Sequence, residues 1–168
     1  MLHIIKSIRE LNFGALMSVY AEGNLENGQD RWPEEPPMRQ LQLAEEGFYE
    51  YLRYDFFDAP GSFYAVWEEK GKWVSALRME PFQDGMLLEA LETAPEHRGN
   101  GYAENLIRSV LDRLEPCKVY SHVGKTNAAS LRVHEKCGFC RISERAVYID
   151  GSVNAYCCTL LYEKTREV

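Results

Sequence analysis

The chain has 168 residues, the length of one domain, and its 45% hydrophobic and 27% charged residues are typical of a globular protein. Its net charge of −7 argues against nucleic acid as a partner. No apolar run approaches the length of a membrane span, and the first ten residues lack the plan of a signal peptide. We therefore expect residues 1–168 to form one cytoplasmic domain with no membrane partner.

The five cysteines are an odd number, which favours free, packed thiols in a reducing compartment over a disulfide framework. We expect no metal site.

The negative charge is concentrated near the N-terminus. Residues 1–60 contain 11 Asp and Glu against 5 Lys and Arg, whereas residues 61–168 contain 15 against 14. This imbalance has two interpretations, a solvated surface that keeps the protein soluble or a field that favours a cationic partner. An acidic cluster flanks a proline-rich stretch near Trp32 and consists of Glu22, Glu26, Asp30, Glu34 and Glu35.

The first half of the chain alternates between strand and helix patterns. We expect strands at residues 2–8, 62–69, 72–81 and 86–95, and helices from about Asn12 and over residues 38–57. The stretch EGNLENGQDRWPEEPP, residues 22–37, is long, polar and rich in glycine and proline, and we interpret it as an irregular break between the two helices. Lys70-Gly71 predicts a hairpin turn between two of the strands.

The second half has the clearest helix pattern. Apolar residues recur at helical spacing after Gly101, and the helix ends before Pro116. We expect a strand at residues 118–124, a helix at 128–137, and a closing hairpin of residues 140–149 and 154–164 around Asp150-Gly151.

Two glycines and an arginine precede the helix that follows Gly101. The order Arg98-Gly99-Asn100-Gly101 matches neither a Walker loop nor a dinucleotide fingerprint, because Lys-Ser/Thr and the third glycine are missing. A helix start with bare backbone and a cation nearby fits a pyrophosphate. A purely structural turn is the alternative interpretation.

The segment KTNAASLRVHEKCGF, residues 125–139, carries a second polar pattern. Asn127 is placed to cap a helix, and Asn127, Ser130 and His134 fall on one narrow arc of it. Such an arc is typical of a helix that lines a cleft. An ordinary capped amphipathic helix explains the same pattern.

Together these two segments resemble the GNAT (GCN5-related) N-acetyltransferase family. The pyrophosphate signature of that family, Arg/Gln-x-x-Gly-x-Gly/Ala, is matched by Arg98, Gly101 and Ala103. Its downstream signature is matched by Asn127 and by the run Glu135-Lys136-x-Gly138-Phe139.

The resemblance implies an α/β (α+β) fold, with a mixed, mostly antiparallel sheet of about seven strands flanked by about four helices. It implies acetyl-CoA as cosubstrate, with the pantetheine arm between the splayed fourth and fifth strands and the diphosphate on the helix that starts near Gly101. The cofactor-binding residues that it implies are Thr93, Ala94, Arg98, Gly99, Asn100, Gly101, Tyr102, Ala103, Asn127 and Ser130.

The catalytic groups follow less directly from the motifs than the cofactor site does. Many members of the family carry a tyrosine that protonates the leaving thiolate, and this chain has His134 at that position. A histidine can do the same work or serve as a pocket residue without proton transfer, and the choice stays open.

For the base, Glu89 and Glu92 interrupt an apolar strand and are expected on opposite faces of it. Glu92 is the first choice because it lies nearer the diverging ends of the strands, and His122 is a weaker candidate. Backbone N–H groups of Thr93 and Ala94 are expected to bind the acetyl carbonyl.

The function predicted from the sequence is acetyl transfer from acetyl-CoA to a primary amine of a small cationic molecule, by direct attack. The alternatives are a non-catalytic acyl-CoA-binding module and a domain that acts mainly through protein contacts. The acceptor and the oligomeric state stay open, and a homodimer is one possibility.

Overall fold

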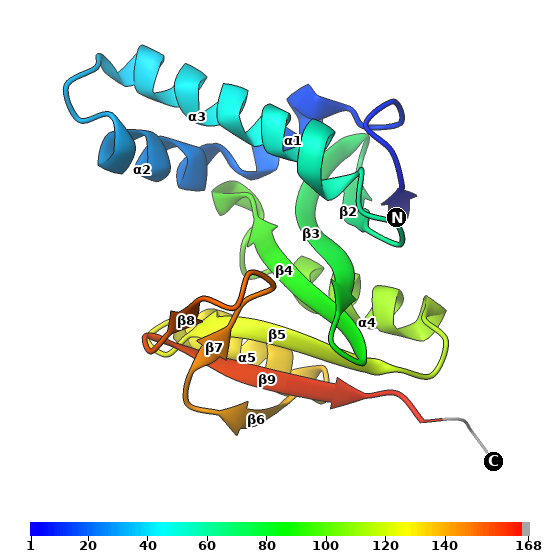
Figure 1. Cartoon of the computed structure of the whole chain (residues 1–168). Coiled ribbons are helices and arrows are strands. Elements are labelled where there is room, and N and C mark those ends of the chain that lie inside the picture. The colour runs from blue at the N-terminus through cyan, green and yellow to red at the C-terminus, as the bar shows by residue number, and fades with distance from the viewer. Residues whose placement is uncertain (166–168) are drawn as a thin grey trace.

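A central sheet with helices on both faces organises residues 1–165, the part of the chain that the computed structural model describes (Figure 1). The α-helices are α1 (Phe13–Val19), α2 (Ala21–Arg31), α3 (Pro37–Tyr51), α4 (Tyr102–Arg113) and α5 (Ala128–Lys136). The strands are β1 (Leu2–Ile5), β2 (Phe63–Glu69), β3 (Lys72–Phe82), β4 (Gly85–Thr93), β5 (Lys118–Gly124), β6 (Cys140–Ser143), β7 (Ala146–Val147), β8 (Val153–Asn154) and β9 (Cys157–Glu163).

Seven of the strands form one sheet in the order β1-β2-β3-β4-β5-β9-β6. Every neighbouring pair in it is antiparallel except β4 and β5, which run parallel. The expected mixed, mostly antiparallel sheet of about seven strands is confirmed. The Lys70-Gly71 hairpin turn is confirmed as well, because both residues have the positive φ values, 50° and 79°, that a tight turn of this kind requires.

Helix α2 corrects the expected irregular break at residues 22–37. Residues 21–31 are helical despite two glycines and two asparagines, whose helix propensity is low. Packing against α3 supplies the stability, because a Cβ added at Gly28 would lie only 2.6 Å from the Gln40 carbonyl oxygen. The glycine that signals a break in the sequence therefore allows two helices to cross closely.

Three further boundaries differ from expectation. The first strand ends at Ile5, and the helix expected at residues 38–57 is α3 followed by a π-helical turn, Leu52–Phe56. The closing hairpin is split, because β6 pairs with β9 in the main sheet while β7 and β8 form a separate two-stranded ribbon.

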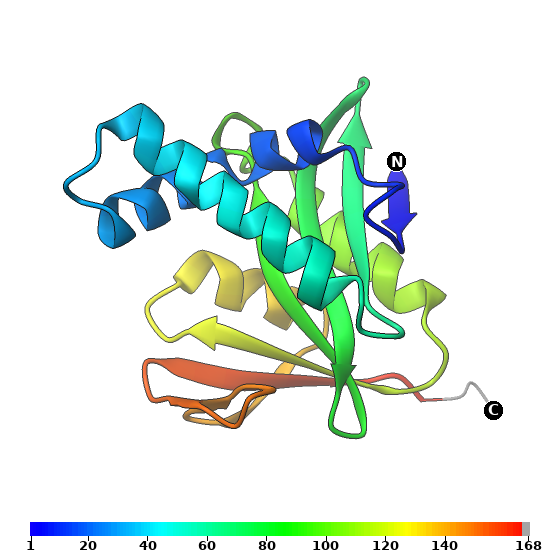
Figure 2. The same cartoon turned by 45° about the horizontal axis from the view of Figure 1, so that its top comes forward.

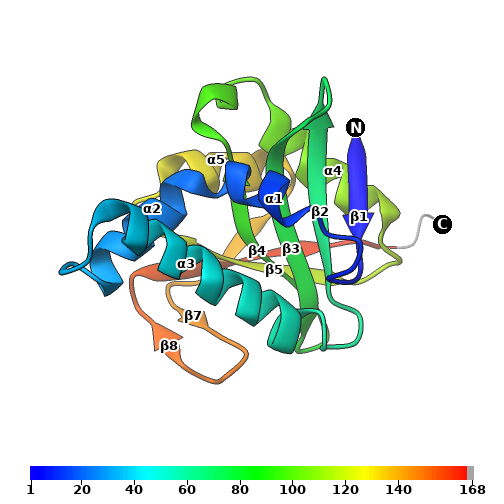
Figure 3. The same cartoon turned by 90° about the horizontal axis from the view of Figure 1, so that it is seen from above.

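The sheet separates two cores. Helices α1 and α3 cover one face of β2 to β4 (Figures 2 and 3). In the core on this face, Leu16 and Leu52 pack with Tyr64 and Ala76. Helix α4 covers the other face, where Ile107 packs with strand residues of the second core.

Strands β4 and β5 form a fork. They pair in parallel from Gly85↔Lys118 to Leu88↔Ser121 and then diverge, as Figure 1 shows. The splay expected from the family resemblance is thus present, with Leu88 and Ser121 at its vertex.

A bulge in β4 changes which face its glutamates share. Ala90 has a φ of 49°, and the β3–β4 register shifts so that Ala76 pairs with Glu92 and Arg78 with Glu89. Since Ala76 and Arg78 lie on one face of β3, both glutamates lie on that same face. The expectation of opposite faces is wrong, because the bulge interrupts the alternation of side chains.

Candidate active site

The turn before α4 presents open backbone. Gly101 is the N-cap of α4 with a φ of 77°, and no side chain caps the helix. Among the described residues 1–165, and apart from the immediate chain neighbours, no atom lies within 4 Å of a Cβ built at Gly99 or Gly101. The Asn100 amide donates to the His97 and Arg98 carbonyls at 3.0 and 3.2 Å, which fixes the turn. The first N–H groups of α4 are therefore oriented toward open space, as anion binding requires.

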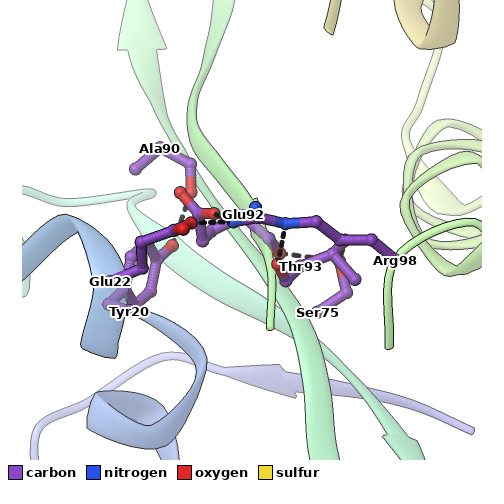
Figure 4. A network of polar contacts seen from close by, with 7 residues as sticks. All are labelled: Tyr20, Glu22, Ser75, Ala90, Glu92, Thr93 and Arg98. Atoms are coloured by element: carbon purple, nitrogen blue, oxygen red, sulfur yellow. Dashed lines mark hydrogen bonds and ion pairs between the residues drawn. The ribbon is translucent and has the colours of Figure 1, made fainter. Parts of the chain in front are cut away.

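Arg98 extends from this turn toward β4 and α2 (Figure 4). Its guanidinium donates to the Thr93 carbonyl at 3.0 Å and to the Glu92 carboxylate at 2.9 Å, and it also pairs with Glu22 of α2. The sequence predicted Arg98 as a cationic partner of the diphosphate. In this structure its side chain joins the turn to two carboxylates instead.

The backbone N–H groups of Thr93 and Ala94, at the end of β4, differ in whether they are bonded to β3. The Ala94 N–H donates to the Val74 carbonyl at 3.0 Å, so it is not available for an acetyl carbonyl, contrary to expectation. Along two antiparallel strands, residue pairs that exchange backbone hydrogen bonds alternate with pairs that do not. The neighbouring Ser75–Thr93 pair is therefore the non-bonded kind, and the Thr93 N–H points away from β3. Thr93 remains a candidate donor.

A cavity of about 160 Å³ lies in the fork between β4 and β5. All three residues of the predicted polar arc of α5, Asn127, Ser130 and His134, line it. Asn127 caps α5 as predicted, since its side chain accepts from the Ser130 N–H at 3.0 Å. Helix α5 thus contributes one wall of this cavity.

His134 lies beneath the vertex of the fork. Its side chain is buried, with 1% exposure, and stacks edge-on against Phe139. Its Nε2 is 3.0 Å from the Ser121 hydroxyl, and its Nδ1 is 2.8 Å from the Ser130 carbonyl. Both ring nitrogens are therefore engaged inside the protein.

The protonation of His134 follows from these partners. A carbonyl only accepts, so Nδ1 carries the proton and donates to Ser130. Burial lowers the pKa of His134 and favours the neutral ring, whose Nε2 is an acceptor. The single Ser121 hydroxyl proton is then shared between Nε2 and the Leu88 carbonyl, each 3.0 Å from the hydroxyl oxygen. The proton of this neutral ring is bonded to the Ser130 carbonyl and does not point toward a thiolate, so the geometry favours the pocket-residue interpretation over the acid.

The two sequence-predicted glutamates have different partners. Glu92 is bound by Arg98, and burial raises its pKa while the Arg98 contact opposes the rise. Glu89 lines the fork cavity and pairs with Arg78, whose Nε lies 3.0 Å from the Glu89 carboxylate. Glu89, not Glu92, is thus the carboxylate beside the cavity.

His122 is engaged at both nitrogens. Its Nε2 lies 3.0 Å from the Val147 carbonyl and its Nδ1 3.0 Å from the Thr159 hydroxyl, and burial lowers its pKa. A neutral, tethered ring of this kind is a weak base. The geometry supports a structural role for His122.

The family model for the acetyltransferase (GNAT) family matches residues 25–139, a span that contains the Gly101 turn, the fork and α5. The chain belongs to the GNAT family. It is therefore an acyltransferase, and acetyl-CoA is the cosubstrate of the family, as the sequence predicted.

Solved structures of GNAT enzymes have the same fold. The ribosomal-protein-S18-alanine N-acetyltransferase of Escherichia coli aligns with a TM-score of 0.60 and 16% identity, covering 100% of this chain and 97% of that one. The spermidine N-acetyltransferase of Vibrio cholerae, solved with CoA and spermine, aligns with a TM-score of 0.61 and 22% identity, covering 97% and 95%. These identities support the fold alone.

One curated relative matches a short segment. The spermidine N(1)-acetyltransferase of Vibrio cholerae serotype O1 is 42% identical over 50 residues, which are 27% of this chain and 29% of the relative. The match therefore spans less than a third of that relative's length.

The GNAT cosubstrate fits the residues that are present. The uncapped start of α4 suits its diphosphate, because the backbone around Gly99 and Gly101 is open to close approach. The fork cavity lies where the reactive end of the pantetheine arm is expected. Within residues 1–165, no helix is long and apolar enough to cross a bilayer, and no cluster suited to a metal ion occurs.

Two polar residues at the site were missed by sequence analysis. Ser121 joins the two strands of the fork, since its hydroxyl lies 3.0 Å from the Leu88 carbonyl. Glu80 of β3 lies two residues from Arg78 on the same face, and burial, followed by the influence of Glu89, raises its pKa to about 7. The available signal was the spacing of Arg78 and Glu80, which places two charged side chains on one face of an otherwise apolar strand.

Proposed function

We propose that this GNAT protein transfers the acetyl group of acetyl-CoA to a primary amine of a small cationic molecule, with a polyamine as the first candidate. The observation that carries the proposal is the row of carboxylates beside the fork. Glu89 lines the cavity, and Glu92 and Glu22 meet at Arg98 on the same side of β4. Against the two guanidiniums of Arg78 and Arg98, the three carboxylates leave one net negative charge, which attracts ammonium groups.

The spacing of this row suits a molecule with more than one ammonium group. Glu89 and Glu92 pair with Arg78 and Ala76, two residues apart on β3. At about 3.3 Å per residue, their positions are about 7 Å apart. An acceptor with two ammonium groups separated by a few methylenes can reach both. The short match to a spermidine acetyltransferase agrees with this acceptor class.

The chain supplies three functions to the reaction: binding of the diphosphate, polarisation of the acetyl carbonyl and acceptance of a proton. The start of α4 binds the diphosphate through backbone N–H groups. The Thr93 N–H polarises the acetyl carbonyl and stabilises its developing negative charge. A carboxylate beside the cavity accepts a proton from the ammonium, and the free amine attacks the carbonyl carbon, so that a C–N bond forms and the C–S bond breaks.

His134 has a positioning role in this scheme. It holds Ser121 at the vertex of the fork and keeps the cavity walls in register. A thiol is a stronger acid than an alkylammonium group, so the CoA thiolate departs without an obligatory acid and takes up the proton that the attacking nitrogen loses.

The proposal is tested by release of CoA thiol from acetyl-CoA in the presence of a panel of amines. We expect turnover with polyamines that falls as ionic strength rises, because salt screens the acidic row. A preference for uncharged amines, or polyamine turnover indifferent to salt, would contradict the proposed acceptor. Binding of acetyl-CoA without turnover with any amine would contradict catalysis.

Paired variants test the acidic row itself. Glu22→Gln removes a carboxylate that pairs with Arg98, and Glu45→Gln removes one on α3 that is neither among the residues lining the fork cavity nor among the partners of Arg98. We expect Glu22→Gln to raise the KM for a polyamine about threefold or more and to weaken its salt dependence. Glu45→Gln is expected to behave as wild type. If Glu22→Gln and Glu45→Gln changed the kinetics equally, the acidic row would act only as part of the general surface charge.

A further inference from the structure

A second cavity, of about 760 Å³, lies beside Met86 at the start of β4. The fork cavity lies beside the later residues 88–91 of the same strand. Among residues 1–165, the two cavities have no lining residue in common. Small-molecule sites have volumes of roughly 300–1,000 Å³, so the second cavity is large enough to be a separate site.

Much of the wall of this cavity is apolar. Its apolar side chains come from β1, the start of β2, the start of β4, the end of α4 and the segment before β2. They include Ile4, Phe57, Phe63, Met86, Val110 and Leu114. All of these except Val110 are only half-buried, so apolar surface is left in contact with water. Covering that surface favours a ligand with an apolar body.

The charged part of the wall is positive. Lys6 and Arg113 line the cavity, and no Asp or Glu does so within residues 1–165. In the same part of the chain, neither the Lys6 ammonium nor the Arg113 guanidinium forms an ion pair. The Glu10 carboxylate accepts from the Lys6 backbone N–H, at 3.0 Å. Asp58 and Asp112 adjoin lining residues along the chain but are exposed and lie outside the wall.

Arg113 lies in the last turn of α4, where a basic side chain ordinarily stabilises the negative end of a helix. Lys164 supplies that cation here, because its ammonium donates to the Leu111 and Asp112 carbonyls at 2.9 and 2.8 Å. The helix end is thus neutralised without Arg113. The Arg113 guanidinium has the parallel N–H donors that suit a carboxylate.

Ser62 adds an unpaired polar group to the same wall. The residue is 6% exposed, and its hydroxyl oxygen is buried with no hydrogen-bond partner among residues 1–165. Burying a hydroxyl without a partner costs free energy. Rotation about χ1 between staggered positions moves the hydroxyl while the backbone stays in place. An oxygen of a ligand in the cavity would supply the missing partner.

We propose that this cavity binds an organic anion that has an apolar body and a carboxylate. The apolar wall covers the body, Arg113 and Lys6 pair with the carboxylate, and Ser62 donates a hydrogen bond to it. This ligand is opposite in charge to the cationic amine proposed for the fork. The inference goes beyond the proposed function, because the site is separate from that of acetyl transfer.

Binding is tested with 4-phenylbutanoate and with 4-phenylbutanol, which has the same body and no charge. NMR of a methyl-labelled protein follows Met86 and Val110, both of which line the cavity. We expect saturable shifts of both methyl signals and an affinity for 4-phenylbutanoate at least about tenfold higher than for the alcohol. The shifts should persist in saturating CoA, since CoA is expected at the other end of α4 and in the fork.

Matched variants test the role of the cation. Arg113→Met removes the guanidinium and keeps an apolar stem, and Arg132→Met makes the same change at an exposed position of α5. We expect Arg113→Met to lower the affinity for 4-phenylbutanoate about fivefold or more and to leave that for 4-phenylbutanol unchanged. Arg132→Met should bind both probes as wild type does.

Ser62→Ala tests the buried hydroxyl. Its affinity for 4-phenylbutanoate should fall about threefold or more, while its unfolding midpoint without ligand stays at or above that of wild type. Equal affinities for the acid and the alcohol, or equal losses in Arg113→Met and Arg132→Met, would overturn the anion site. Absence of shifts at Met86 and Val110, or their disappearance when CoA is added, would overturn the location. None of these readouts depends on acetyl transfer.

Discussion

The Ser121 hydroxyl lies 3.0 Å from Nε2 of His134, directly at the point where β4 and β5 part. The same hydroxyl lies 3.0 Å from the Leu88 carbonyl across the fork. Because the histidine is neutral and buried, its hydrogen bond goes to the protein framework and not to a reacting group. His134, at the position where many family members carry a tyrosine, therefore supports the walls of the cleft.

Replacing His134 by glutamine should therefore affect stability more than chemistry. We expect the free energy of unfolding of His134→Gln to fall by about 1–3 kcal/mol, because a packed, hydrogen-bonded ring is lost. Its kcat should stay within several-fold of wild type. Denaturant unfolding and steady-state kinetics check this. A loss of kcat of about 100-fold at unchanged stability would instead identify His134 as the proton donor.

The Gly101 turn should bind CoA through its open backbone. Gly101→Val adds a β-branched side chain at a φ of 77°, where it is strained and obstructs the approach of the diphosphate. Gly151→Val, at a φ of 81° in the β7–β8 turn, imposes the same strain far from the site. By calorimetry we expect CoA affinity to fall at least about tenfold only in Gly101→Val. Equal affinities in the two variants would reduce the Gly101 turn to a structural element.

Two glycines of α2 should respond in opposite directions to the same substitution. A Cβ at Gly28 meets the Gln40 backbone at 2.6 Å, whereas a Cβ at Gly23 meets nothing within 4 Å. Gly28→Ala should cost about 1–3 kcal/mol of unfolding free energy by overpacking. Gly23→Ala should gain about 0.5–1 kcal/mol from helix propensity. Thermal unfolding measures both, and a stabilised Gly28→Ala would contradict the close crossing of α2 and α3.

The stability of the protein should depend on Glu80. Its folded pKa, about 7, is above the ordinary value of 4.5, so the folded state binds more protons than the unfolded chain between these values. The contribution of Glu80 to the free energy of unfolding is complete below about pH 4.5 and declines as pH rises to about 7. Partial exposure limits the change to the order of 1 kcal/mol. Glu80→Gln should flatten this slope, and an unchanged slope would show that Glu80 titrates normally.

The sequence predicted the parts of this protein that local patterns encode. The apolar spacing after Gly101 predicted α4, Asn127 predicted the cap of α5, and the two motifs indicated the family to which the chain belongs. These features depend on residues that are neighbours in the chain. Their positions therefore needed no knowledge of tertiary contacts.

The errors arose where distant segments decide the outcome. No residue pattern in the sequence of β4 identifies Ala90 as the bulge that brings Glu89 and Glu92 to one face of the sheet. The helical state of α2 depends on its crossing with α3, and the raised pKa of Glu80 depends on its burial in the fold and then on Glu89 of another strand. Such effects follow from packing, which a local pattern does not contain.

Acetyl transfer to a cationic amine is tested most directly by incubating the wild-type protein with acetyl-CoA and spermidine. Release of CoA thiol and formation of N-acetylated product should be measured together at low and at high salt. We expect equal amounts of thiol and acetylated amine, formed catalytically and more slowly at high salt. Saturable binding of acetyl-CoA with no acetylated product from spermidine or any other amine would contradict it.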